Sequence, residues 1–382
     1  MTTYILDAVR SPRAKARPDG GLAAMKPHEL VGGLIDALDA RNNGAARKVD
    51  ALILGAVGQV GAQGANVALV TKMYAGLPDE AYAYSINNYC VSGLTAIGQA
   101  AQMVEAGGAT TALAGGVEMM SRVPFMGDKA DYYEDASFPP RTRYIPVVVA
   151  ADRLAEDLGV TREEMDAAAL TSQQKTAAAE GTDLLKSRIA INGLDREEPA
   201  RASTTAESLA AMPAAFGALG QQYAGALEGR VIDHRHTVAH APPMCDGAAL
   251  AIVTGEAKGA RAKIVAYAEA GGDPAASLTA GFTAMDRVLA KANLSLDDMD
   301  RIEFMEAFAV TIVKFMRDRK VDPDKVNVGG GHMAKGHPMG ATGAILLSSL
   351  LDALDACNGR YGLVVAHGAQ GVGSAMIVER MG

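Results

Sequence analysis

The chain has 382 residues, 49% hydrophobic and 21% charged, a globular balance that allows two or three domains. Its net charge of -8 argues against nucleic acid or an anionic membrane as a partner. The only cysteines, Cys90, Cys245 and Cys357, are too few and too scattered for a disulfide framework. They indicate a reducing compartment, so we expect a cytoplasmic protein.

Three further patterns limit the classes of function. The first residues, MTTYILDAVR, read as a strand without the leader pattern of a secreted protein. We expect no run long and apolar enough to span a bilayer. The cysteines and the seven histidines are not grouped as a zinc site requires, so we predict no metal.

Strands and helices alternate over the first third of the chain. The expected elements are buried strands over residues 4–9, 51–57 and 112–116 and a helix over residues 27–43. In that helix Leu30, Leu34 and Leu38 share one face. Such alternation is typical of a mainly parallel sheet covered on both faces, so the sequence predicts an α/β fold.

The stretch 84–108 holds the residue best placed to act as a nucleophile. A strand over 83–87 is followed by two turn-forming asparagines, Cys90 and a helix with Leu94 on its apolar face. At a helix N-terminus the free N–H groups favour a thiolate and can donate to an acyl oxyanion. Alone, Cys90 would more often be a small buried hydrophobe.

The middle and last thirds have a different organisation. Residues 121–238 read as an insertion of helices and loops with no sheet of its own, including a helix over 161–179 that Thr161 caps together with Glu164. Alternation then resumes. The expected strands are 248–254, 263–268, 301–305, 362–366 and 374–379, and the expected helices are 278–293, one from 307 and one from 340.

The two alternating blocks read as weak copies of one plan. Each places a strand and a turn rich in glycine or asparagine ahead of a helix, INNYCVSGLTAIG first and VNVGGGHMAKGHPMGATGAIL second. We therefore expect an N-terminal half over 1–120 completed by 239–256, a loop domain over 121–238, and a C-terminal half over 257–382. Ligands in such sheets bind beyond the strand C-termini, so Cys90 and the loop 329–343 could face each other.

Two histidines complete the candidate chemistry. His337 lies between Gly336 and Pro338 in the glycine-rich loop 329–343. His367 ends a strand that small residues follow. A histidine near a cysteine can stabilise a thiolate and polarise a carbonyl, although a lone loop histidine more often only bonds within its loop.

These stretches together resemble the thiolase family over nearly the whole chain. The most specific are NNYCVSGLTAI, ALAGGVEMMS, LTSQQKTAAA, MEAFA and GGGHMAKGHPMGATGA. The resemblance implies two duplicated α/β halves with stacked mixed sheets, in αβαβα layers, plus an inserted loop domain. It also implies an acyl-CoA C-acyltransferase that makes or cleaves 3-oxoacyl-CoA, with coenzyme A thioesters as substrates and no tightly bound cofactor.

The resemblance assigns roles to matching residues. Cys90 would accept the acyl group, and His337 would activate it and help to hold the substrate thioester oxygen. The backbone N–H groups of Cys90 and Ala369 would form an oxyanion hole. Acyl-CoA, acetyl-CoA and free CoA are the expected partners, and a homodimer or homotetramer is the expected assembly.

The chain departs from the family pattern at the site itself. His367 stands where the family has a second catalytic cysteine, and it is the candidate acid or base. Met305 replaces the asparagine of the usual NEAF motif, and a thioether cannot reproduce an amide. His332, absent from the usual loop, is a candidate substitute, although a surface position would be the more ordinary one.

Three residues are further candidates for the substrate pocket. Pro242 stands at the usual position of a serine that touches the pantetheine arm, and His240 is close to it. Pro146, in YIPVVVAADRLAE, alters the segment that shapes the acyl pocket and slightly favours an acyl group bulkier than acetoacetyl.

Two other functions fit the same residues. One is a condensing enzyme of the ketoacyl synthase type, which decarboxylates a malonyl donor and uses a cysteine with two histidines. The other is a thiolase-like subunit of a larger acyltransferase assembly with little activity alone.

Overall fold

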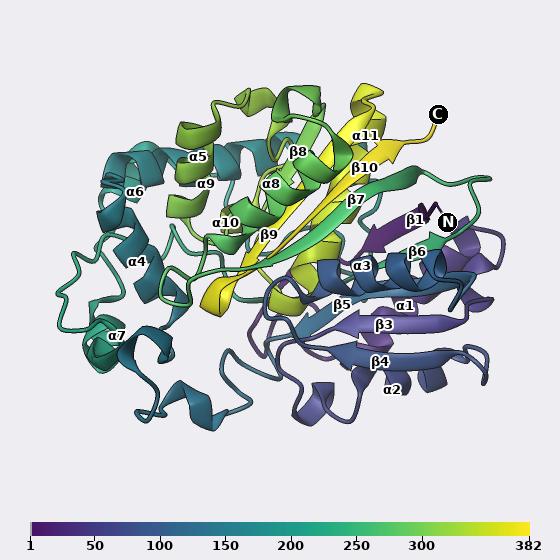
Figure 1. Ribbon diagram of the computed structural model, residues 1–382, viewed down its shortest axis with the longest axis horizontal. Helices are drawn as coiled ribbons and strands as arrows, with labels where there is room; N and C mark the ends of the chain where they lie inside the picture. The colour runs from purple at the N-terminus through teal and green to yellow at the C-terminus, as the bar shows by residue number, and fades with distance from the viewer. Residues whose placement is uncertain (1) are drawn as a thin grey trace.

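A single mixed sheet runs through the molecule (Figure 1). The computed structural model describes residues 2–382. Among them ten strands follow the order β4-β3-β5-β6-β1-β7-β10-β9-β8, with β2 beside β6. The strands are β1 Tyr4–Arg10, β2 Ala14–Lys15, β3 Ala51–Gly55, β4 Tyr82–Ile86, β5 Thr111–Met119, β6 Cys245–Thr254, β7 Ala262–Gly271, β8 Arg301–Phe304, β9 Tyr361–Gly368 and β10 Val372–Arg380.

The sheet consists of two half-sheets joined over a short contact. β3 pairs in parallel with β4 and β5, and β8 pairs in parallel with β9, whereas the other pairs are antiparallel. The half-sheets meet where β1 pairs with β7 through only two partners, Tyr4 with Lys263 and Ile5 with Ala262. The stacked sheets expected from the sequence are therefore continuous at this one point.

Helices form three layers around the half-sheets. The helices are α1 Pro27–Arg41, α2 Val67–Ala75, α3 Ser92–Glu105, α4 Val147–Asp157, α5 Arg162–Ala179, α6 Ala206–Ala210, α7 Gly217–Gln222, α8 Ala280–Ala292, α9 Ala309–Arg319, α10 His332–Lys335 and α11 Thr342–Cys357. α3 and α11 pack on each other and on strands of both half-sheets, so they form the middle layer. α1 contacts the outer face of the N-terminal half-sheet and α8 contacts that of the C-terminal half-sheet. The αβαβα layering is confirmed.

The central helix corrects one expectation about membranes. The segment Met339–Cys357 is long and apolar enough to span a bilayer by length and composition, although 78% of it is buried in the fold. Sheet residues cover α11 on both sides of the middle layer, and every residue from Thr342 to Leu354 is buried. A helix that is apolar on most of its faces, with its buried Asp352 paired to Arg261, fits a position inside the core.

The chain between β5 and β6 contributes no strand to the sheet of residues 2–382. Its helices gather at one side of the sheet, where α4 and α5 contact α9 and α5 also contacts α10 (Figure 1). The predicted cap of α5 is confirmed: the Glu164 N–H donates to Thr161 Oγ1 at 3.3 Å, and the Thr161 N–H donates to Glu164 Oε2 at 2.8 Å.

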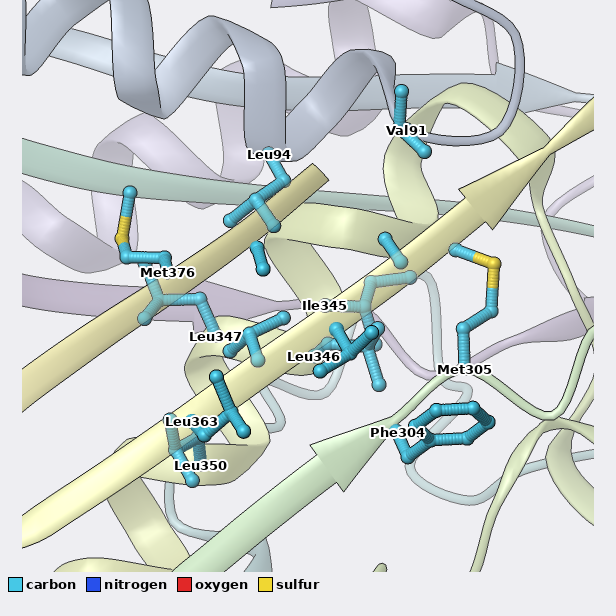
Figure 2. Close-up of a cluster of buried hydrophobic side chains, with 14 of the residues drawn as sticks. Val91, Leu94, Phe304, Met305, Ile345, Leu346, Leu347, Leu350, Leu363 and Met376 are labelled. Carbon is cyan, nitrogen blue, oxygen red and sulfur yellow. The ribbon is translucent and has the colours of Figure 1, made fainter. Parts of the chain in front are cut away.

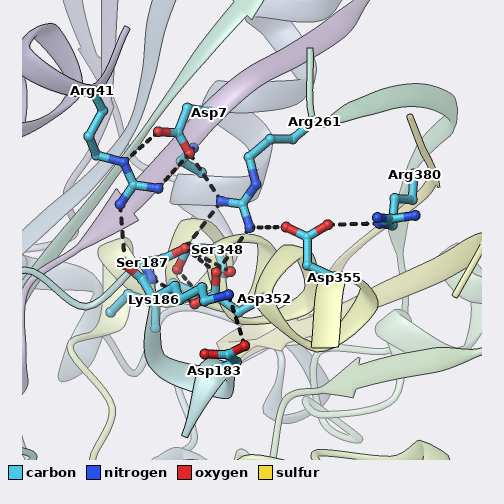
Figure 3. A network of polar contacts seen from close by, with 12 residues as sticks. Asp7, Arg41, Asp183, Lys186, Ser187, Arg261, Ser348, Asp352, Asp355 and Arg380 are labelled. Carbon is cyan, nitrogen blue, oxygen red and sulfur yellow. Dashed lines mark hydrogen bonds and ion pairs between the residues drawn. The ribbon is translucent and has the colours of Figure 1, made fainter. Parts of the chain in front are cut away.

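A network of charged side chains ties the halves together (Figure 3). The Arg261 guanidinium contacts Asp7 of β1 at 3.0 Å and, from α11, Asp352 at 3.0 Å and Asp355 at 2.8 Å. Arg380 of β10 completes it with a 2.8 Å contact to Asp355. Asp7 also pairs with Arg41 and Asp355 with Arg380, so removal of Arg261 would leave the buried Asp352 as the one carboxylate of this network without an ionic partner.

Candidate active site

Cys90 lies in a tight turn between β4 and α3, as the sequence predicts. The preceding residue, Tyr89, has a φ of 47°, a left-handed conformation that costs a bulky residue about 1–3 kcal/mol. Hydrogen bonds hold the turn: Ser92 Oγ accepts from the Asn88 N–H at 2.8 Å and donates to the Tyr89 carbonyl at 2.6 Å. The strained turn sets Cys90 just ahead of the first turn of α3.

The Cys90 sulfur faces backbone donors and a small cavity. The backbone N–H groups of Ala369 and of Cys90 itself lie near enough to the sulfur to lower the pKa of the thiol. The cavity has a volume of about 30 Å³, room for about two water molecules. Its lining residues are Val57, Gly58, Tyr89, Cys90, Pro124, Phe125, Met126, Gly127, Asp128, Tyr133, Tyr144, Val147, Met339 and Ala369. The two N–H groups predicted to form an oxyanion hole therefore lie near the Cys90 sulfur, at the edge of a space that admits little water.

Burial controls the ionisation of Cys90. It raises the pKa of the thiol to about 12, and the nearby Glu118 carboxylate also raises it, whereas the N–H groups of Ala369 and Cys90 lower it. The expectation that the helix N-terminus favours a thiolate is therefore wrong for the free protein, because desolvation outweighs the backbone donors. A base must take the proton before the sulfur can attack.

His337 is held at two points. Its ring Nδ1 lies 2.7 Å from Thr342 Oγ1, and its backbone N–H donates to the Pro243 carbonyl at 2.9 Å. Burial, with a smaller effect of the Arg13 guanidinium, lowers the pKa of His337 to about 4. The ring is therefore neutral at pH 7, as a base for a thiol must be. Its Nε2 makes no hydrogen bond within residues 2–382.

His367 is less accessible than the sequence suggests. The side chain is fully buried, stacked on Phe282 and edge-on to Phe304. Nε2 lies 3.1 Å from the Met305 carbonyl, which fixes the ring proton on Nε2. Nδ1 has no hydrogen-bond partner among residues 2–382, and it faces Gly281 so closely that a Cβ there would lie 2.0 Å away. The ring must rotate before Nδ1 can take a proton from a substrate.

Met305 and His332, two of the residues at which this chain departs from the usual family motifs, are both buried. Met305 belongs to the buried apolar cluster of Figure 2, together with Phe304, Ile345 and Leu346. His332 is not a surface histidine, because it is only 2% exposed. Its ring stands perpendicular to that of His337, with 5.8 Å between centroids.

Of the predicted site residues only Cys90 and Ala369 line the cavity, so the three remaining pocket candidates lie outside its lining, as do Met305 and the three site histidines. His240 is fully buried, and its Nε2 lies 2.7 Å from an Asp166 carboxylate oxygen. This contact joins the segment before β6 to helix α5. Pro242 is half-buried in the chain leading into β6. Pro146 precedes the first turn of α4, next to the lining residue Val147.

Two buried glutamates that sequence reasoning did not assign hold the site loops. Glu118 accepts hydrogen bonds from the N–H groups of Val57 at 2.9 Å, Gly58 at 3.0 Å and Gly340 at 3.0 Å. Glu306 accepts from Ser172 Oγ at 2.7 Å and from the Met333 N–H at 3.2 Å. Glu118 lies in the motif ALAGGVEMMS and Glu306 in the motif MEAFA. No local pattern shows that their hydrogen-bond partners come from distant loops.

Comparison with known proteins decides the family. Residues 3–257 match the thiolase N-terminal domain and residues 258–380 the thiolase C-terminal domain. The chain belongs to the thiolase family. A relative named beta-ketoadipyl-CoA thiolase from Acinetobacter baylyi is 35% identical, over 99% of each chain. One named acetyl-CoA acetyltransferase from Allochromatium vinosum is 34% identical, over 99% of this chain and 98% of its own.

Solved thiolase structures agree with the fold. The Bacillus anthracis acetyl-CoA acetyltransferase superposes with a TM-score of 0.85 and 30% identity, over 100% of this chain and 99% of its own. The human mitochondrial 3-ketoacyl-CoA thiolase gives 0.86 and 28% over the same shares. This thiolase is accordingly an acyltransferase with the thiolase fold.

Proposed function

We propose that Cys90 carries the acyl group in the reversible cleavage of 3-oxoacyl-CoA by CoA. The observation that supports this most is the placement of Cys90 in the turn before α3, beside a cavity, with the N–H groups of Cys90 and Ala369 close to its sulfur. Such paired donors stabilise the negative oxygen of a tetrahedral intermediate. His337, neutral at pH 7, is the base for the thiol.

In the cleavage direction, His337 takes the proton of Cys90 and the thiolate attacks the C3 carbonyl carbon. The C2–C3 bond then breaks, which leaves the acyl group on sulfur and the electron pair on the enolate of acetyl-CoA. Protonation of that carbon releases acetyl-CoA. A CoA thiol next gives its proton to His367 and attacks the thioester carbon of the acyl-enzyme. Cys90 leaves as a thiolate and takes back the proton held by His337, and the product is a shortened acyl-CoA.

The α-carbon needs its own proton donor and acceptor. His367 remains our candidate, because the free lone pair on Nδ1 can take the α-proton in the condensation direction. In the cleavage direction the ring must first gain a proton, and the imidazolium so formed returns it to the α-carbon. His367 can serve only after the ring turns away from Gly281 and breaks its bond to the Met305 carbonyl. Assembly as a homodimer or homotetramer and a cytoplasmic location stay predictions from the sequence.

The lining of the cavity favours an uncharged acyl group. Asp128 lies there, with both carboxylate oxygens accepting from Tyr133 Oη at 2.9 and 3.0 Å, and the set of lining residues contains no lysine or arginine. A carboxylate on an acyl chain that passes this cavity would lie near Asp128, a like charge, with no cation among the lining residues to pair with it. We therefore propose neutral 3-oxoacyl-CoA substrates rather than the 3-oxoadipyl-CoA that the names of several relatives imply.

Thiolysis of 3-oxohexanoyl-CoA and 3-oxoadipyl-CoA compares substrates of equal chain length that differ in the terminal carboxylate. We expect kcat/KM to be at least about 10-fold higher for the neutral substrate. Asp128→Asn should bring the kcat/KM values for the two substrates closer together. A preference for 3-oxoadipyl-CoA would contradict the substrate class, and the absence of thiolysis with both substrates would contradict the proposed function.

A further inference from the structure

His332 is a buried imidazole that the protein leaves without hydrogen bonds. It is the first residue of α10, and neither ring nitrogen has a partner within residues 2–382. A neutral imidazole carries one N–H donor and one lone pair, and leaving such groups unpaired in the interior is unfavourable. Unpaired buried donors of this kind are uncommon in folded proteins and suggest a ligand.

The turn that carries His332 is rigid. On its N-terminal side, the Gly331 N–H donates to Ser172 Oγ at 3.1 Å, and on its C-terminal side the Met333 N–H donates to Glu306. Ser172 itself donates to Glu306, so α5 and the MEAF segment hold both flanks of His332. A Cβ at Gly331 would overlap the Glu306 carboxylate, which fixes the backbone at this point.

The position of His332 beside His337 allows both rings to reach one ligand atom. An oxygen that accepts a hydrogen bond from an imidazole lies about 4 Å from the ring centroid, so two rings can share one oxygen when their centroids are less than about 8 Å apart. The centroids of His332 and His337 are 5.8 Å apart. The rings are nearly perpendicular, so their edges can converge on one point.

We propose that a ring N–H of His332 donates a hydrogen bond to the thioester oxygen of the enolising acetyl-CoA unit, beside the hydrogen bond from His337. His332 is then a further catalytic residue, and its role rests on the proposed function. It supplies the donor that the Met305 side chain cannot. Burial and the Arg13 guanidinium lower the pKa of His332, so the ring donates as a neutral group at pH 7.

Two variants of similar volume test the donor. His332→Leu removes both ring nitrogens, whereas His332→Gln keeps an N–H donor. The readouts are exchange of the acetyl-CoA methyl protons in D₂O, followed by NMR, and acylation of Cys90 by acetyl-CoA, followed by mass spectrometry. We expect His332→Leu to lower the exchange rate about 100-fold, the usual effect of one lost oxyanion donor. His332→Gln should recover about 10-fold of that loss.

Acylation separates this inference from the proposed function. The acyl oxygen on Cys90 lies against the Cys90 and Ala369 N–H groups, so His332→Leu should slow acylation far less than exchange. His367→Gln, which cannot accept a proton, should lose exchange although it retains an N–H donor. Equal exchange rates in wild type and His332→Leu would overturn the role of His332, and so would equal losses of exchange and acylation. A wild type that never acylates Cys90 would refute the proposed function instead.

Discussion

Replacing His337 with alanine is expected to lower thiolysis at pH 7 about 1,000-fold, within the range that a positioned general base contributes. Without His337 the proton of Cys90 must leave to solvent, and burial raises the pKa of that thiol to about 12. The thiolate fraction then falls tenfold for each pH unit below that value.

The pH profile distinguishes loss of the base from loss of structure. Since burial lowers the pKa of His337 to about 4, the base is neutral above about pH 5 and the wild-type rate should be nearly flat from about pH 6 to 9. In His337→Ala the rate should rise about tenfold per pH unit through the same range. His28→Ala, on the surface-facing helix α1, is the matched control and should keep the wild-type profile. A flat profile in His337→Ala would show that another group takes the proton.

Glu118→Gln is expected to destabilise the fold by about 3 kcal/mol or more. Each Glu118 oxygen accepts two hydrogen bonds, Oε2 from Val57 and Gly340 and Oε1 from Gly58 and Gln63. The NH₂ group of a glutamine would face two of these donors whichever way it pointed, and unpaired buried donors cost about 1–3 kcal/mol each. Urea denaturation measures the change in the free energy of unfolding.

The control for Glu118 is a glutamate in an exposed ion pair. Glu379 contacts Arg360 at 2.7 Å, and the Arg360 side chain is 67% exposed. Glu379→Gln should therefore change the free energy of unfolding by less than about 1 kcal/mol. If Glu118→Gln changed it as little, Glu118 would not be the acceptor that holds the Val57 and Gly340 loops.

The sequence predicts the order of elements and the placement of Cys90 well. The strand, turn and helix around it, the Thr161 cap and the helix after the glycine-rich loop all rest on local patterns, which short-range physics determines. Local patterns give no bounds for the helices α2, α4, α6, α7 and α10. The α4 sequence, VVVAADRLAED, opens with three β-branched residues that read as a strand, although the alanines, leucine and charged residues that follow favour a helix.

The parts of the site that the sequence misses depend on what surrounds a side chain. Burial decides that the Cys90 thiol keeps its proton and that His332 is inside the protein. Packing against Phe282 and Gly281 decides where the free nitrogen of His367 faces. The acceptor roles of Glu118 and Glu306 likewise depend on loops that lie far apart in the chain.

The central role of Cys90 is tested most directly by the mass of the peptide that contains Cys90, after the wild-type protein is mixed with acyl-CoA and quenched in acid. Peptide mass spectrometry should find the acyl group as a thioester on Cys90, and addition of CoA before the quench should remove it. Acylation confined to Cys245 or Cys357, or no acylation of any cysteine, would contradict the central role of Cys90.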